Sequence, residues 1–233
     1  MTVLAIETAT QTCSVALVQG ETTLASRVLP PETKAAKYLA PAIREALAEA
    51  GKSVDDVTAL AVDVGPGSFT GLRVGIGLAK GLAFARDLPV YGILSLDVLA
   101  EQARRDLPEG ALGDGFAATL DAYRGQVFLK PFAAHDIEDS GEATVLDLDK
   151  WLASPQGLTL LFGQVPKARL AEVRERGLFL TAGEQVVPDA AAVGRLASRR
   201  IAAGHPPDDV FALLPVYLRK SAAEEKADSR EAS

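Results

Sequence analysis

Two carboxylates stand where apolar strands end, and they are the acids best placed for chemistry in a cleft. Glu7 ends the apolar run that begins at Val3, and Asp121 ends the apolar run 116–120. Each run is followed by a short polar turn and a second strand, so the same pattern opens each half of the chain. This echo predicts two related lobes that face one another across a cleft, with Glu7 and Asp121 on opposite walls. The alternative is that strand, acid and turn form a common local pattern without further meaning.

A glycine-rich segment, residues 65–71, follows another apolar strand and opens a helix. Amides at a helix N-terminus attract anions, so the segment looks like a phosphate loop. Its spacing fits neither standard motif, because the third glycine of the dinucleotide fingerprint comes one residue late and Pro66 removes an amide donor. Residues 51–53 imitate the end of a P-loop but follow a helix instead of a strand. The sequence therefore predicts neither standard nucleotide motif.

Metal and covalent chemistry have few candidates. The two histidines, His135 and His205, stand far apart, and neither has a second histidine four residues away. The single cysteine, Cys13, lies in a predicted strand and is most simply a small core residue, since a nucleophilic role needs a histidine neighbour. No serine lies in a G-x-S-x-G elbow. We predict no catalytic residue and no metal ligand.

The helix predicted from Gly71 to Ala85 is the unusual element. It is apolar on every side except at Arg73 and Lys80, which is typical of a helix buried all round. Glycine inside a helix is about 1 kcal/mol less favourable than alanine, so it is retained where a side chain would collide with a neighbour. The small residues form two rows, Gly71, Gly75, Ala79 and Ala83 in one and Gly77, Gly81 and Ala85 in the other. One layer of sheet can cover one row, and either a second layer of this chain or another subunit must cover the second.

Composition limits the class of protein. The chain has 233 residues, one cysteine and a net charge of −7. It is long enough for one large or two small domains, and a reducing compartment is its natural setting. The acidic balance and the lack of a basic cluster argue against broad nucleic-acid binding by this chain alone. The apolar N-terminal run meets an acid after six residues and has no basic start, so we expect a strand instead of a signal peptide, and a cytoplasmic protein without membrane spans.

Periodicity predicts the elements that position these residues. The first half reads as strands 3–7, 13–18 and 22–29, helix 34–50, strand 57–64, helix 71–86, strand 90–94 and a helix 95–105 capped by Ser95. After a linker at 108–115 come strands 116–120, 126–133 and 143–146, a short helix around Trp151, strands 158–162 and 178–181, and helix 190–203. This order predicts a mixed α/β fold of two lobes, residues 1–107 and 108–233. Whether the last segment packs back on the first lobe stays open.

Several segments together resemble the TsaB (YeaZ) family. They are Ile6-Glu7-Thr8-Ala9-Thr10 with 13–17, the run 65–75 with its Gly-Pro-Gly-Ser-Phe-Thr-Gly block, 121–127 and 215–219. The resemblance extends from Leu4 to Arg219, and the block at 65–71 is its most specific part. It implies a two-lobed α/β fold of the actin, Hsp70 and sugar-kinase type (RNase H-like), with a mixed sheet and helices in each lobe.

The same resemblance implies a part in making threonylcarbamoyladenosine (t6A) beside the anticodon of tRNAs that read codons beginning with A. Proteins of this family are similar to the catalytic subunit TsaD but lack its metal-binding histidines, and they act as its partner, with the ATPase TsaE joining the assembly. The resemblance further implies a homodimer when the chain is alone and contact with tRNA only through the complex. No cofactor is expected to be held firmly by this chain, although ATP or ADP and Mg²⁺ are candidates at the complex interface. The family commonly has aspartate at the position of Glu7, which puts nucleotide binding in question.

The leading hypothesis is a non-catalytic partner subunit that activates a TsaD-like transferase. Its partner surface is expected on two helices, at Leu39, Ile43, Leu47, Gly71, Arg73, Val74, Gly75, Leu78, Ala79 and Leu82. The candidate nucleotide cleft comprises Glu7, Thr8, Thr10 and Asp121. On this hypothesis Gly75→Leu and Ala79→Arg break the complex and leave the monomer folded. The alternative is an ATP-dependent transferase or peptidase that acts in its own interlobe cleft, and a direct tRNA-binding module is a third hypothesis that the acidic balance disfavours.

Overall fold

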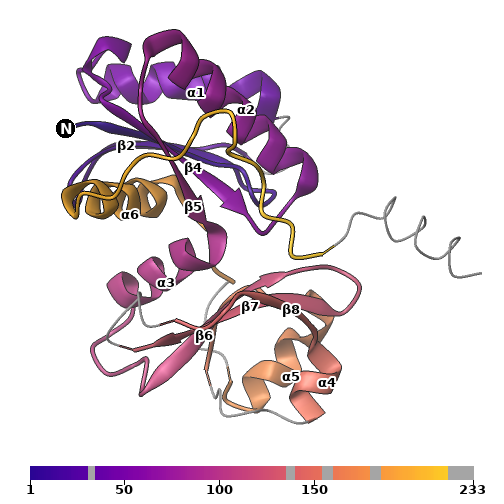
Figure 1. Ribbon diagram of the computed structural model, residues 1–233. Coiled ribbons are helices and arrows are strands. Elements are labelled where there is room, and N and C mark those ends of the chain that lie inside the picture. Colours follow the sequence, from indigo (N-terminus) through magenta and orange to yellow (C-terminus); the bar gives the residue numbers. More distant parts are fainter. Residues whose placement is uncertain (31–34, 135–139, 154–159, 179–184, 220–233) are drawn as a thin grey trace, which may run out of the picture.

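Two sheets and their helices form successive layers of the molecule (Figure 1). The computed structural model describes residues 1–30, 35–134, 140–153, 160–178 and 185–219. His135 and nearly all of the predicted strand 178–181 lie outside these residues. The mixed α/β architecture that the sequence predicts is confirmed for the described part of the chain.

The first sheet has five strands in the order β3-β2-β1-β4-β5. Its strands are β1 (Val3–Glu7), β2 (Ser14–Gln19), β3 (Thr22–Val28), β4 (Ala59–Gly65) and β5 (Val90–Leu94). The strand β1 pairs antiparallel with β2 and parallel with β4, and β4 pairs parallel with β5. The central strands β1 and β4 are buried along their whole length, as expected for parallel strands with both faces covered.

Helices from both ends of the sequence cover this first sheet. On one face lie α1 (Ala35–Glu49) and α2 (Phe69–Arg86), which pack on β1, β2 and β4 in one apolar core. On the other face lies α6 (Ala190–Ala202), coloured orange in Figure 1. Gly194 on α6 permits the close approach, because a Cβ there would press on Val18 and Ala5. The first sheet is therefore completed by a helix from the far end of the chain.

The second sheet repeats the plan of the first around its opening strand. It has the order β8-β7-β6-β9, in which β6 pairs antiparallel with β7 and parallel with β9. The helix α3 packs on one face, and α4 and α5 pack on the other. These elements are β6 (Gly115–Asp121), β7 (Gln126–Ala133), β8 (Thr144–Asp147), β9 (Leu161–Gly163), α3 (Ser95–Asp106), α4 (Leu148–Ala153) and α5 (Leu170–Glu175). The hairpin predicted at the start of each half of the chain is confirmed.

Residues 205–217, which we call the strap, leave α6 and run back across the first lobe (Figure 1). Asp208 bridges to Val90 on β5, and its Oδ2 accepts a hydrogen bond of 2.7 Å from the amide of Gly92. Further along, the amide of Val216 donates to the carbonyl oxygen of Val64 at 2.7 Å. The strap is thus bonded to the first lobe at both of its ends.

Most predicted elements are confirmed, but the prediction that Ser95 caps α3 is wrong. The residue before α3 is Leu94, and the Ser95 hydroxyl does not bond the helix N-terminus. Its Oγ instead donates to Oδ1 of Asp63 at 2.6 Å, because that carboxylate is fully buried at the end of β4 and needs a donor. The helix α5 and the two 3₁₀ turns Val54–Asp56 and Lys167–Arg169 were not predicted.

Candidate functional site

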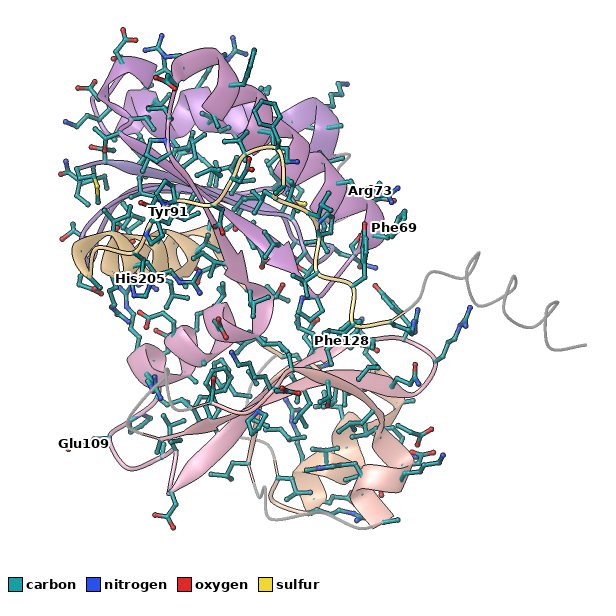
Figure 2. The ribbon with its side chains drawn as sticks, viewed as in Figure 1. Phe69, Arg73, Tyr91, Glu109, Phe128 and His205 are labelled. Carbon is teal, nitrogen blue, oxygen red and sulfur yellow. The ribbon has the colours of Figure 1, made fainter. Side chains whose placement is uncertain are left out.

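A cavity of about 1000 Å³ opens between the two lobes. One wall comes from the loop after β1 and the start of α2, the other from β6, β7 and the turn that joins them, and the end of the strap closes one side. Figure 2 shows Phe69 and Arg73 on the α2 side and Phe128 on the β7 side. The volume lies at the upper end of the range for small-molecule sites.

The structure brings together two of the four residues proposed for the cleft. Thr10 and Asp121 line the cavity from opposite lobes, and Oδ1 of Asp121 accepts a hydrogen bond of 2.7 Å from the amide of Tyr123. Glu7 and Thr8 are fully buried and do not line the cavity. Two of the four predicted cleft residues therefore lie beneath its floor.

The glycine-rich segment covers Glu7 and Thr8. The amide of Ser68 donates to the carbonyl oxygen of Ala9 at 2.6 Å. A Cβ at Gly67 would overlap that same carbonyl, and a Cβ at Gly71 or Gly75 would overlap Thr8. The amide of Gly71 is already bonded to the Ser68 side chain at 3.2 Å. These glycines thus admit the chain's own backbone in the place where a phosphate loop would admit a phosphate.

Below the cavity floor, Glu7 and Asp63 form a buried acidic pair. Oε1 of Glu7 accepts from the amide of Ala9 at 2.6 Å, and Oδ1 of Asp63 accepts from the amide of Gly65 at 2.7 Å as well as from Ser95. The second oxygen of each carboxyl has no hydrogen-bond partner among the described residues. Burial, and then the charge of Asp63, raise the pKa of Glu7 well above its usual value, and burial raises the pKa of Asp63 to about 7.

The cysteine beside this pair is not activated. Cys13 is buried, and burial followed by the charge of Glu7 raises the pKa of its thiol to about 11. A thiol with this pKa is protonated at neutral pH, whereas the nucleophilic form is the thiolate. The prediction that Cys13 is a small core residue agrees with this environment.

An aromatic and cationic cluster lies at the rim of the cavity. The rings of Phe69 and Tyr217 stack with centroids 5.1 Å apart, and the Arg73 guanidinium lies 3.7 Å from the Phe69 centroid. Nε of Arg73 also donates to the Tyr217 hydroxyl at 3.1 Å. No local pattern in the sequence predicts a contact between residues 69 and 217. The sequence indicated the segment 215–219 only through the family resemblance.

The second row of small residues on α2 faces outward. Among the residues that the structure describes, a Cβ at Gly77 or Gly81 would have no neighbour within 4 Å beyond its own helix backbone, and Ala85 is exposed. Phe84 is 77% exposed beside this row and meets Phe211 of the strap edge to face, with centroids 6.4 Å apart. We call Gly77, Gly81, Phe84, Ala85, Phe211 and Leu214 the α2 face. Phe211 is 78% exposed and Leu214 68% exposed, so the α2 face is apolar as well as open.

The residues predicted for a partner surface fall into two groups. Half of them are buried in the chain's own core, namely Leu39, Ile43, Leu47, Gly75 and Ala79. Arg73 is exposed, whereas Gly71, Val74, Leu78 and Leu82 are half-buried. The expectation that Gly75→Leu leaves the monomer folded is corrected by the contact of Gly75 with Thr8. The open surface on α2 lies on the row of Gly77 and Gly81 instead.

Within the described residues, no three His, Cys, Asp or Glu side chains are grouped as ligands for a metal ion. His205 is exposed at the start of the strap (Figure 2). In the same part of the chain, the structure contains no helix with the length and apolar character needed to cross a bilayer.

Comparison with known proteins places the chain in a family. The family model for TsaD, described as tRNA N6-adenosine threonylcarbamoyltransferase, matches residues 21–161. The tRNA threonylcarbamoyladenosine biosynthesis protein TsaB of Escherichia coli (strain K12) is 34% identical over 240 residues, which span 99% of this chain and 100% of that protein. The chain belongs to the TsaB family. The TsaB of Bacillus subtilis (strain 168) is 28% identical over 97% of each chain.

A solved TsaB-type structure supports the same assignment. YeaZ from Pseudomonas aeruginosa matches this fold with a TM-score of 0.72 at 30% sequence identity, over 93% of this chain and 99% of that chain. This likeness and the two mixed sheets confirm the predicted fold class. The family assignment made from the segments 6–10, 65–75, 121–127 and 215–219 is likewise confirmed.

Proposed function

We propose that this chain is a non-catalytic partner subunit in the synthesis of threonylcarbamoyladenosine in tRNA, and that it docks on a TsaD-like transferase through the α2 face. The relatives that span the whole chain carry the name of this biosynthesis. The open row of Gly77 and Gly81 is the observation that carries the docking part of the proposal.

The α2 face has the character of a docking surface. Three of the ten large hydrophobic side chains that are exposed within the described residues belong to it: Phe84, Phe211 and Leu214. Aromatic side chains are enriched in protein interfaces, and larger exposed apolar patches mark interaction sites. Glycines without a packing partner are unfavourable in a helix, so their presence favours close approach by a second helix.

The interior of the chain supports a non-catalytic part. Glu7, one of the two acids predicted for the cleft, is enclosed beneath the cavity floor. The thiol of Cys13 is held in its protonated form, and the glycine-rich segment is filled by the Thr8 and Ala9 backbone. We propose that catalysis belongs to the TsaD-like partner, that a TsaE-like ATPase joins the assembly, and that any ATP or ADP with Mg²⁺ binds between subunits. We propose also that two copies pair through the α2 face when the chain is alone.

Arginine substitutions on the open row test this proposal. Gly77→Arg and Gly81→Arg place a long charged side chain on the α2 face without touching the core. We expect both variants to keep the circular dichroism spectrum of the wild type and to melt at or slightly above its temperature, because their Cβ atoms meet open space and arginine is a better helix former than glycine. We expect them to lose co-elution with the TsaD-like protein of the same organism and to support less than about a tenth of the tRNA modification in a reconstituted assay.

The control is Ala171→Arg, which makes a similar change at an exposed position of α5 in the other lobe. It should co-elute and support modification as the wild type does. Normal co-elution of folded Gly77→Arg and Gly81→Arg would remove the α2 face from the proposal. Modification by the isolated chain without a partner would overturn the non-catalytic assignment.

A further inference from the structure

We propose that the interlobe cavity binds one nucleotide unit, an aromatic base with a single phosphate, at the site formed by Arg73, Tyr123, Lys167, Tyr217 and Arg219. This inference deepens the proposed function, since it gives the partner subunit a direct contact with RNA, but its test uses the isolated chain. The charge of the cavity, its aromatic rings and the bonded amides of its floor all favour such a ligand.

The cavity is positively charged in a chain that is acidic. The whole sequence carries a net charge of −7, yet the described residues that line the cavity include three cations, Arg73, Lys167 and Arg219, and one carboxylate, Asp121. The Arg219 guanidinium is held in place because its Nη1 donates to the carbonyl oxygen of Ala122 at 2.6 Å. Fixed cations facing an enclosed space favour an anionic ligand, and Arg is well suited to phosphate.

Aromatic rings stand at the same rim. Tyr123 is 57% exposed, and Phe69 and Tyr217 are each 43% exposed. Tyr123 lies at the tip of the β6–β7 hairpin. Its backbone is left-handed (φ 61°), a conformation that residues other than glycine rarely adopt. Tyr123 lines the cavity although its backbone conformation is unfavourable. Exposed aromatic rings beside cations are the usual platform for an unpaired base and its phosphate.

The cavity floor favours one phosphate over a magnesium-bound triphosphate. The Ser68 amide is bonded to Ala9, and the Gly71 amide is bonded to the Ser68 side chain, so neither points free into the cavity. Glu7 is enclosed, which leaves Asp121 as the single carboxylate among the lining residues. A magnesium triphosphate site draws on free loop amides and acidic oxygen ligands. The lining supplies instead cationic side chains and exposed rings, which suit a base and one phosphate.

Titration with three ligands distinguishes a free nucleotide from a nucleotide within RNA. We would titrate the isolated full-length chain with 5′-AMP, with magnesium ATP and with a single-stranded hexaribonucleotide, and follow binding by calorimetry at two salt concentrations. We expect AMP and the hexamer to bind and to compete with one another, with the hexamer tighter and more salt-dependent. AMP without the hexamer would assign the site to a free nucleotide and overturn the RNA contact. Magnesium ATP more than about tenfold tighter than AMP would overturn the single-phosphate assignment.

Two variants locate the binding site. Tyr123→Asn removes the ring and keeps a residue that tolerates left-handed backbone, and we expect it to weaken hexamer binding about tenfold or more. Lys167→Ala should weaken binding several-fold and lower the salt slope by about one phosphate contact. The matched controls are Tyr38→Ala and Lys150→Ala, exposed residues of the same type that do not line the cavity.

Co-elution with the partner and binding of the hexamer test the docking proposal and the nucleotide site independently. Tyr123→Asn and Lys167→Ala should co-elute with the TsaD-like partner as the wild type does, because neither lies on the α2 face. Equal affinities for the hexamer in all four variants, or no binding of AMP and hexamer at millimolar concentration, would overturn the site. Loss of co-elution in Gly77→Arg with intact hexamer binding would leave it standing.

Discussion

At the scale of single residues, the glycines of α2 do two different things on two sides of one helix. Gly71 and Gly75 meet Thr8, and a Cβ on either would enter space that Thr8 already occupies. A Cβ on Gly77 or Gly81 would meet none of the described residues outside its own helix. The same residue type is thus a packing requirement on one row, and on the other row it is an unfavourable residue that the isolated fold does not need.

This contrast predicts opposite effects on stability. Gly75→Ala should lower the free energy of unfolding by about 1–3 kcal/mol, because the new methyl group overlaps the Thr8 side chain in a packed core. Gly77→Ala should raise it by about 0.5–1 kcal/mol, because alanine is the better helix former and the site is open. Urea titration of the two variants beside the wild type measures both. A shift of the same sign in both variants would contradict this account of the two rows.

The buried acids are the second feature at this scale. Burial raises the pKa of Glu7 and of Asp63, so the folded protein holds protons that the unfolded chain releases from its carboxyls near their usual values of 4.5 and 3.8. Where the folded state binds more protons, stability falls as pH rises. The stability from this pair is therefore fully present below about pH 4 and is lost as pH rises toward and through 7.

Asp63→Asn tests this assignment. The side-chain oxygen of the amide can still accept from Gly65 and Ser95, while the buried charge is removed. We expect the variant to gain on the order of 2–4 kcal/mol relative to the wild type at pH 8 and little at pH 4, since each pKa unit is worth about 1.4 kcal/mol. Chemical unfolding at the two pH values measures the difference. Asp114→Asn, at an exposed carboxylate, is the control, and an equal gain in both variants would refute the role of burial.

At the scale of elements, ion pairs join α3 to α6. Glu101 on α3 is 3% exposed and bonds Arg195, which is also 3% exposed, at 3.3 Å. Arg199, one turn further along α6, donates to both oxygens of Glu101 at 2.6 and 2.8 Å and also pairs with the exposed Glu21. This cluster ties the helix that packs on the second sheet to the helix that completes the first.

Removal of Glu101 should be costly because Arg195 would keep a buried charge without its partner. We expect Glu101→Ala to lower the free energy of unfolding by about 3–5 kcal/mol, whereas Glu21→Ala at the exposed end of the same cluster should change it by less than about 1 kcal/mol. The double variant Glu101→Leu with Arg195→Met should recover most of the loss, since an apolar pair of similar size avoids the unpaired charge. Thermal unfolding monitored by circular dichroism compares the three. Equal losses in Glu101→Ala and Glu21→Ala would mean that burial does not govern this cluster.

Local pattern was sufficient for most elements and insufficient for the site. The alternating and continuous apolar runs of β1, β4 and β6 and the spacing in α2 predicted their place and type. The Ser95 hydroxyl bonds Asp63, which lies 32 residues earlier in the sequence. A capping rule considers only neighbouring residues, so it could not predict this bond. The cavity rim has the same difficulty, because Phe69, Tyr123 and Tyr217 come from distant segments. Local signals for the cavity came from the acid at the end of β6 and from the glycine-rich segment 65–71, of which residues 66–70 line it.

At the scale of the whole molecule, the strap connects two surfaces with different proposed roles. It carries Phe211 and Leu214 of the α2 face, and its end supplies Tyr217 to the cavity. The strap is fixed at two points. Its Val216 amide donates to β4, and Nζ of Lys80 on α2 donates to the carbonyl oxygen of Phe211 at 3.1 Å. Two surfaces that share one fixed segment are positioned relative to one another by that segment.

The late position of α6 has a consequence for how the protein is made. A ribosome releases β1 to β5 first, but the helix that covers their second face begins only at Ala190. At typical rates of synthesis, roughly five to twenty seconds separate the emergence of β5 from that of α6. The second sheet and its helices come from the continuous stretch 95–175, so this half can complete its fold during translation. Until α6 has been synthesised, the face of the first sheet that α6 covers stays exposed on the nascent chain.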